Sequence, residues 1–353
     1  MSQIKLSGLI VLLMGLAIYM LYIYYIGFDE VWRMLSSIGL LEISLFMLLS
    51  LVVIFLHSFA WYLLIRGYSA ENNIRFTDVF GIIVIALFSG YVIPIGGVTE
   101  IIRIALSVIK YRLRSSVAIS SIIMHRLYVS SSALIIFFIV FILRAYFRSV
   151  YTLSFGELII ISAYTILVVL PNISILGIMS TDIFKRILDR FKYFMETKIV
   201  KKKISFEPEI FMRDYTSYLR KSIFSINSVL AYVISIAEWF FLSLAVYILV
   251  YGFISKLQDP IYAVMSAIIF QMIYWILPLS FIGSIGIAEF IMTLALQIIG
   301  LSPYLATSLV ILYRTITFLT IVLLYYPIMK ISKIEDLSKI VREGIDMIYS
   351  KTK

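Results

Sequence analysis

Long apolar runs separated by short polar segments cover most of the chain. Uninterrupted runs of roughly 20 residues or more are long enough for a helix to cross a bilayer. Such runs occupy residues 6–27, 38–65, 116–143, 151–179, 222–251 and 303–329. The pattern predicts an all-α polytopic membrane protein with about six full transmembrane helices.

Two further apolar stretches are interrupted by proline and glycine. Residues 77–109 break at Pro94–Gly97, and residues 260–300 break at Pro278–Gly286. Proline removes a backbone donor and glycine weakens a helix, so such clusters divide a helix in two. We therefore expect two re-entrant helical hairpins, in each of which a shorter helix returns to the side from which the first helix entered.

The two interrupted stretches share a short motif. Each contains Gly-x-x-Glu at the start of its second helix, and each is followed by an arginine inside the next apolar run. The matching residues are Gly97, Glu100 and Arg126 in the first half and Gly286, Glu289 and Arg314 in the second. The match indicates an internal duplication, and the alternative is a chance similarity in a chain rich in isoleucine and leucine.

The lysines and arginines of the loops indicate how the two halves are oriented. If the N-terminus lies inside and both hairpins return to their own side, nearly all basic loop residues fall inside, as the positive-inside rule requires. The outside then receives only Arg33, Arg144, Arg148 and Lys256. A single spanning hairpin would instead place the basic segments on opposite sides. We expect an inverted-topology repeat with halves 6–149 and 150–330 in one membrane domain, 1–353, with both termini cytoplasmic at the plasma membrane.

Composition narrows the class of protein further. The chain is 62% hydrophobic and 14% charged, with a net charge of +10. In a membrane protein such a basic excess reflects topology and contact with anionic headgroups, so we expect no nucleic-acid partner. The absence of cysteine excludes disulfides and thiolate metal sites. His57 and His125 are too few and too scattered to predict a metal site, and we expect no cofactor.

Two polar segments are expected on the cytoplasmic side. Residues 180–221 form a basic loop, and residues 331–353 form an amphipathic tail. Helical spacing of apolar residues in 182–196 and in the tail is typical of helices that lie on an anionic membrane surface. Ordinary solvated connectors are the alternative.

Ionisable residues inside apolar runs are the candidates for function, because a charge in hydrocarbon is unfavourable. They are Glu100, Arg103, Arg126, Glu238, Glu289 and Arg314. Glu238 and His57 lie in the spans that precede the two hairpins, and we expect each to be the third member of its own half-site. No nucleotide-binding loop, catalytic triad or metal-ligand spacing is present, so no autonomous catalysis is expected.

The glutamates and glycines at the hairpin tips have two possible roles. Glu100 and Glu289 begin the returning helices, where a carboxylate can cap exposed N–H groups, pair with an arginine, or do both. Gly97, Gly283 and Gly286 would let a lipid headgroup approach the backbone closely.

Arg126 and Arg314 lie too deep in their spans to reach water easily. A guanidinium there must pair with a carboxylate, a carbonyl or a ligand phosphate, and its planar fork suits phosphate. A structural Arg–Glu pair that holds each hairpin against the following helix is the alternative.

These residues resemble the motifs of the lysylphosphatidylglycerol synthase transmembrane region, the flippase-like domain of the multiple peptide resistance factor. That family typically shows Gly-Glu-x-x-Arg after a Pro/Gly tip, Glu-Arg in the next helix, then Leu-Pro-x-Ser, a glycine-rich turn ending in Glu, and Tyr-Arg. The corresponding residues are Pro94, Gly97, Glu100, Arg103, His125-Arg126, Leu277-Pro278-Leu279-Ser280, Gly283, Gly286, Glu289 and Tyr313-Arg314. The first half departs from the pattern, because His125 replaces a glutamate and the tip lacks an arginine, so its site is expected to carry less charge or bind a different ligand.

The resemblance implies a lipid flippase or a transporter of a lipid-linked headgroup, with anionic or phosphate-bearing membrane lipids as partners. Family members with synthase activity carry an additional soluble domain for which residues 331–353 leave no room, so we expect no synthase activity. Two alternatives remain open: a membrane subunit that works with a lipid-modifying glycosyl- or aminoacyl-transferase, and a regulatory scaffold that transports nothing.

Overall fold

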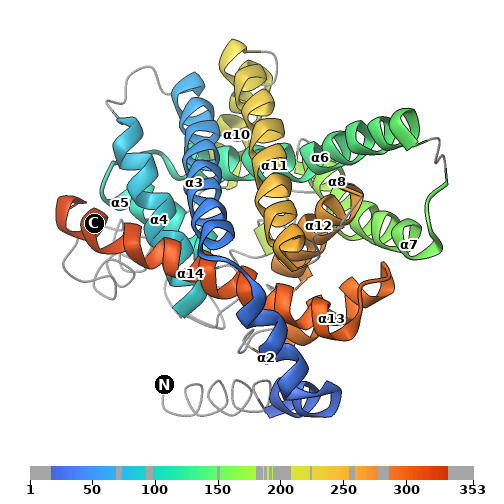
Figure 1. Cartoon of the computed structure of the whole chain (residues 1–353). Helices are drawn as coiled ribbons and strands as arrows, with labels where there is room; N and C mark the ends of the chain where they lie inside the picture. The colour runs from blue at the N-terminus through green and yellow to red at the C-terminus, as the bar shows by residue number, and fades with distance from the viewer. Residues whose placement is uncertain are drawn as a thin grey trace.

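The computed structural model of the chain is helical throughout its described residues. These are 17–68, 74–92, 98–148, 152–179, 208–222, 225–253, 259–276 and 286–332, with the single positions 186, 189, 190 and 193. No strand occurs within these ranges. Figure 1 shows α3 and α11 side by side at the centre, with the other helices around them.

Among the described residues, five helices are long and apolar enough to cross a membrane. They are α3 (Leu40–Tyr68), α6 (Ser115–Arg148), α7 (Phe155–Tyr164) continued through the π-helical turn η1 (Thr165–Val169) into α8 (Leu170–Met179), α11 (Ile226–Phe253) and α14 (Pro303–Ser332). Each coincides with a predicted run, so the prediction of a polytopic helical membrane protein is confirmed. Of the first predicted run, 6–27, the described part is the helix Ala17–Ile26, which leads into α2 (Phe28–Ser37).

The two interrupted stretches form pairs of shorter helices. The first pair is α4 (Phe76–Val92) and α5 (Val98–Ile109), and the second is α12 (Ile261–Ile276) and α13 (Ile287–Ile298). Within each pair the two helices pack against each other. The helices end where the proline and glycine clusters begin, and the tips themselves, with Gly97 and Gly283, lie outside the described residues.

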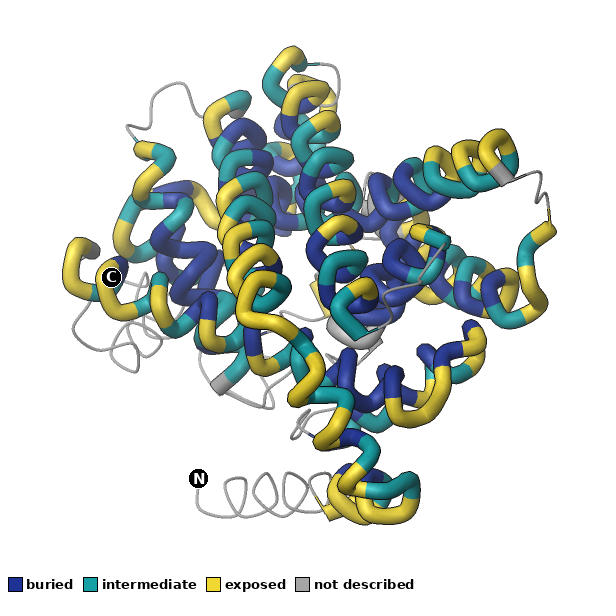
Figure 2. The backbone as a smooth tube through the Cα atoms, in the orientation of Figure 1, coloured by how far each residue is buried: buried dark blue, intermediate teal, exposed yellow. Residues whose placement is uncertain are grey.

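The packing around α3 resembles the packing around α11. Helix α3 contacts α4, and α4 contacts α14; helix α11 contacts α12, and α12 contacts α6. The rings of Phe88 and Tyr325 stack at a centroid distance of 3.8 Å between α4 and α14. Figure 2 shows the buried residues gathered where these helices meet. Phe138, Ile142 and Ile166 on α6 and η1 are exposed, as expected of side chains that face lipid.

Small residues allow several close helix contacts. Buried serines of α6, including Ser120 and Ser132, donate to carbonyl oxygens one turn earlier and so add no unsatisfied group to the interface. At Gly156 in α7, a Cβ would lie 2.0 Å from the Ile298 carbonyl oxygen at the end of α13. Only glycine permits this approach of α7 to α13.

Part of the predicted basic loop 180–221 is a helix docked on the bundle. Helix α10 (Pro208–Ser222) packs against α6 and α3 and buries Phe211, Tyr215 and Tyr218. The Tyr218 hydroxyl donates to the Leu64 carbonyl oxygen at 3.0 Å. Three buried aromatic side chains therefore fix this part of the basic segment to the bundle. The helices predicted for 182–196 and for the tail fall almost wholly outside the described residues.

Candidate functional site

The second-half glutamate both caps its helix and binds the predicted arginine. Glu289 lies in the first turn of α13, and its Oε2 accepts a hydrogen bond from the backbone N–H of Gly286 at 2.5 Å. Its Oε1 accepts from Nε of Arg314 in α14 at 2.8 Å. Gly286 has φ 89°, a conformation that favours glycine at this turn. The two roles predicted for Glu289 therefore coexist in one carboxylate.

A helix of the first half covers this pair. The guanidinium of Arg314 lies over the ring of Tyr91 from α4, 4.9 Å from its centroid. The Tyr91 ring in turn lies 5.6 Å from that of Phe318 on α14. The side chains of Glu289 and Arg314 are only 11% and 12% exposed, so both charged groups are largely buried within the protein.

The first half repeats the pair with less burial. Glu100 lies in the first turn of α5, and its Oε1 accepts a hydrogen bond from Arg126 Nη2 in α6. The side chains of Glu100 and Arg126 are 29% and 22% exposed. The predicted correspondence between the two glutamate–arginine pairs is therefore present in the geometry.

Arg103 lies one turn after Glu100 and is fully buried. Its guanidinium lies over the ring of Trp61 from α3, 4.1 Å from the centroid. Its Nη2 donates to Nδ1 of His125 at 3.0 Å. The Nε and Nη1 atoms of Arg103 are buried and have no hydrogen-bond partner within the described part of the chain. The histidine that replaces a glutamate in the family pattern thus still offers Arg103 an acceptor.

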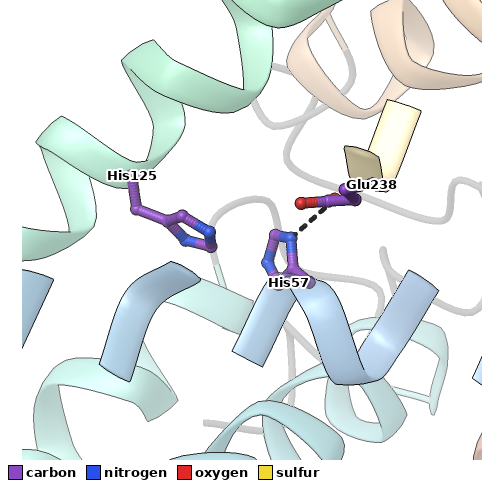
Figure 3. A group of neighbouring side chains, drawn as sticks. All are labelled: His57, His125 and Glu238. Atoms are coloured by element: carbon purple, nitrogen blue, oxygen red, sulfur yellow. Dashed lines mark hydrogen bonds and ion pairs between the residues drawn. The ribbon is translucent and has the colours of Figure 1, made fainter. Parts of the chain in front are cut away.

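His57 and Glu238 meet each other at the interface of α3 and α11. The Nδ1 of His57 lies 2.9 Å from Oε1 of Glu238 (Figure 3). The ring of His125 lies beside that of His57, with a centroid distance of 4.3 Å. We expected His57 and Glu238 in separate half-sites, whereas the central contact of α3 with α11 joins them in one cluster.

The same three residues have the spacing of metal ligands. One atom each of His57, His125 and Glu238 lies within 4.8 Å of the others, the one such group among the described residues. The expectation that the histidines are scattered is therefore wrong. However, a guanidinium only donates, so Nδ1 of His125 accepts from Arg103 and Nε2 carries the hydrogen. A metal would need a lone pair at Nε2, so this donor set does not fit a zinc-type ion.

One buried ionic cluster was not predicted. Arg144 at the end of α6 lies with its Nε 2.6 Å from Asp259, just before α12, and its Nη1 lies 3.7 Å from Glu157 in α7. Glu157 also accepts from the backbone N–H of Ser154 at 2.6 Å, which fixes the start of α7. The loop charges predict an outer-loop position for Arg144, and its place just beyond a long apolar run gives no signal of these partners.

Comparison with known proteins identifies a family for this chain. The family model for the lysylphosphatidylglycerol synthase TM region matches residues 10–324, a stretch that contains both glutamate–arginine pairs and the histidine cluster. No curated protein and no solved structure matches the chain. Since the match covers most of its length, the chain belongs to the family of the lysylphosphatidylglycerol synthase TM region.

Proposed function

We propose that the protein moves an anionic, phosphate-bearing lipid or lipid-linked headgroup between the leaflets of the membrane. The observation that carries this proposal is the repeated pair, in which an arginine on a long apolar helix binds a glutamate that begins a short helix. Ionisable groups at such positions are costly and typically mark substrate pathways. Arg126 and Arg314 would bind the phosphate, with Glu100 and Glu289 holding them in position.

Arg103 gives the first half an additional anion-binding group. Its buried Nε and Nη1 donors lack an acceptor among the described residues, and a phosphate oxygen would satisfy them. Trp61 beneath the guanidinium keeps its plane fixed. Access to this site would require α5 to move relative to α3, because Arg103 is fully buried.

The transport pathway would be formed by two inverted halves. We infer that α4–α5 and α12–α13 are re-entrant hairpins that enter from opposite faces. The matching contacts of α3 with α4 and of α11 with α12, and of α4 with α14 and of α12 with α6, support this arrangement. The loop charges support cytoplasmic termini in the plasma membrane.

A second candidate function is favoured by the family description itself. A transmembrane region of a synthase can serve as the membrane subunit for a lipid-modifying transferase, or as a scaffold that regulates one. In that case the glutamate–arginine pairs would be structural, and the isolated protein would transfer no lipid between leaflets.

The experiment is a leaflet-exchange assay on the full chain in vesicles of phosphatidylcholine and labelled phosphatidylglycerol. We expect wild type to accelerate exchange and Arg314→Ala to reduce it at least about tenfold, the effect of losing about 1.4 kcal/mol of binding in the transition state. Arg213→Ala is the matched control, since it removes an arginine from the exposed surface of α10. If wild type and Arg314→Ala exchange lipid at the same rate, the proposed mechanism is wrong. Absence of exchange in wild type would favour the transferase-subunit or scaffold function.

A further inference from the structure

The two histidines of the cluster differ in whether a ring nitrogen is still able to accept a proton. His125 uses Nδ1 to accept from Arg103, so its Nε2 carries a hydrogen and the ring is neutral. That Nε2 is buried and has no acceptor among the described residues. A second proton could be added only at Nδ1, which already faces a guanidinium. His125 is therefore fixed in one neutral form.

His57 differs because its partner is a carboxylate. If Nδ1 of His57 donates to Oε1 of Glu238, its Nε2 keeps a free lone pair. A proton taken from water at Nε2 would convert the pair to imidazolium and carboxylate, which keeps the same hydrogen bond and strengthens it. The second oxygen of Glu238, Oε2, is buried and unpartnered within the described residues. The cluster thus has spare acceptor capacity for one proton.

Burial also distinguishes the three residues. The His57 side chain is 15% exposed and that of Glu238 is 8% exposed, whereas His125 is fully buried. Both His57 and Glu238 lie within long spans, α3 and α11, away from their ends. His57 is therefore the least buried member of the cluster.

The neighbouring charges leave the cluster balanced before proton uptake. Arg103 and Arg126 from α5 and α6 both interact electrostatically with Glu238, and Arg126 binds Glu100. With neutral histidines, two arginines face two glutamates. A proton added to His57 gives the cluster a net charge of one positive unit. That charge is on the His57 ring, next to the carboxylate of Glu238.

The other helices packed on α3 bring further charged residues. The charged residues of α4, α10 and α14 are Asp78, Glu209, Arg213, Asp214, Arg220, Lys221, Arg314 and Lys330. Asp78 accepts from the Arg75 backbone N–H, and Arg314 binds Glu289. Among the described contacts of His57, Glu238 is the acidic partner.

We propose that His57 and Glu238, joined where α3 meets α11, form an intramembrane proton-binding site. His57 takes up the proton at Nε2, Glu238 stabilises the resulting imidazolium, and Arg103 keeps the adjacent His125 neutral. The further inference that this site couples proton uptake to lipid movement rests on the proposed function. Proton binding at His57 and Glu238 does not depend on that function.

The test uses the fact that the chain contains two histidines. Full-length protein labelled with ¹⁵N at histidine, in nanodiscs of phosphatidylcholine and phosphatidylglycerol, is titrated by NMR between about pH 5 and 8, the range in which histidine changes charge. We expect one histidine to pass from neutral to imidazolium while the other keeps the neutral Nε2–H form throughout. His57→Gln should remove the titrating signal, and His125→Gln the constant one.

A second variant keeps both histidines and tests the proposal even if the histidine variants do not fold. Glu238→Gln keeps an acceptor for His57 but removes the charge that stabilises the imidazolium, so the titration midpoint should move to lower pH. Two titrating histidines, two constant ones, or an unchanged midpoint in Glu238→Gln would contradict the proposal. Stoichiometric Zn²⁺ or Co²⁺ that shifts both histidine signals together would also overturn it, in favour of a metal site.

Coupling is measured separately in vesicles that carry a gradient of one pH unit. If one proton moves with each lipid, the leaflet ratio of labelled phosphatidylglycerol should shift about tenfold in wild type, and not in His57→Gln. If wild type exchanges lipid but the leaflet ratio does not change with the pH gradient, lipid movement is not coupled to proton uptake. A wild type without any exchange would refute the proposed function and coupling together, while the NMR titration would still decide whether the proton site exists.

Discussion

The two glutamate–arginine pairs share one construction but differ in what surrounds them. Around Glu289 and Arg314, each carboxylate oxygen has a donor, one a backbone N–H and the other a guanidinium, and an aromatic ring covers the arginine. Near Glu100 and Arg126, by contrast, lie several polar atoms without hydrogen-bond partners among the described residues. In this structure the second pair is closed, so a phosphate that binds Arg314 would have to displace Glu289 or Tyr91 from it. The first pair opens into a polar cluster that can accept a ligand or a proton directly.

Two matching sequence motifs therefore have different surroundings in the two halves of the protein. The second pair joins α13 to α14. The first pair borders Arg103, His125, His57 and Glu238, and so joins α5 and α6 to both central helices. Variants at equivalent positions of the two halves should therefore behave differently.

The largest expected effect is on stability at the more buried pair. Arg314→Ala leaves the carboxylate of Glu289 buried without its cation, which should lower the free energy of unfolding by about 3–5 kcal/mol. Arg126→Ala should lower it by about 1–3 kcal/mol, because Glu100 is more exposed. Reversible unfolding in mixed micelles measures both values. Equal losses in the two variants would break the distinction between a closed and an open pair.

A smaller effect is expected from removal of the central carboxylate. Glu238→Leu leaves the His57 ring without an acceptor and takes a negative charge away from Arg103 and Arg126, for a loss of about 2–3 kcal/mol in the free energy of unfolding. The same unfolding assay applies. Glu238→Gln is the matched control and should lose less, since it keeps an acceptor. A Leu variant as stable as wild type would show that the cluster is not a structural link between α3 and α11.

The aromatic support of Arg103 gives the next effect. Trp61→Phe removes the hydrogen bond from Nε1 to Ser121 Oγ at 3.0 Å and weakens the contact with the guanidinium, so we expect a loss of about 1–2 kcal/mol in the free energy of unfolding. Ser121→Ala removes the same hydrogen bond and keeps the indole. The difference between the two variants in thermal unfolding reports the ring–guanidinium contact. Identical values would mean that this contact contributes nothing.

The smallest effect concerns how α13 is held in place. Tyr22 on the helix Ala17–Ile26 accepts a hydrogen bond from Gln297 Nε2 at 2.5 Å, and Tyr22→Phe should lower the free energy of unfolding by about 1 kcal/mol. Tyr24→Phe, on the exposed side of the same helix, serves as the control and should leave stability unchanged. A loss in both variants would indicate a general requirement for tyrosine in this helix rather than an anchor for α13.

Much of the fold could be predicted from the sequence because bilayer thickness sets the length of an apolar run. The five long helices of the described residues, and the division of the two interrupted stretches into α4 and α5 and into α12 and α13, follow from that length and from the properties of proline and glycine. The two glutamate–arginine pairs were predicted for a related reason. A glutamate in the first turn of a short helix and an arginine in the next span face each other when those helices pack as neighbours.

The central cluster could not be predicted, because it depends on which faces of α3 and α11 meet. Both helices are apolar nearly all round, so the hydrophobic pattern does not indicate which face of α3 packs against which face of α11. His57 and Glu238 were assigned to separate half-sites for that reason. Likewise, the docking of α10 depends on three aromatic residues in a basic segment whose charge suggested solvent.

The position of Arg314 on α14 has a consequence for how the protein is made. Tyr91 is translated early and Glu289 later, but the partner of both residues is on α14, which is translated last among the described helices. Until α14 inserts, the ring of Tyr91 lacks its cation and the carboxylate of Glu289 lacks its counter-charge. Insertion of α14 therefore completes the Glu289 pair and the Tyr91 contact in one step, and a chain interrupted before Pro303 would leave the carboxylate of Glu289 without its counter-charge in the membrane.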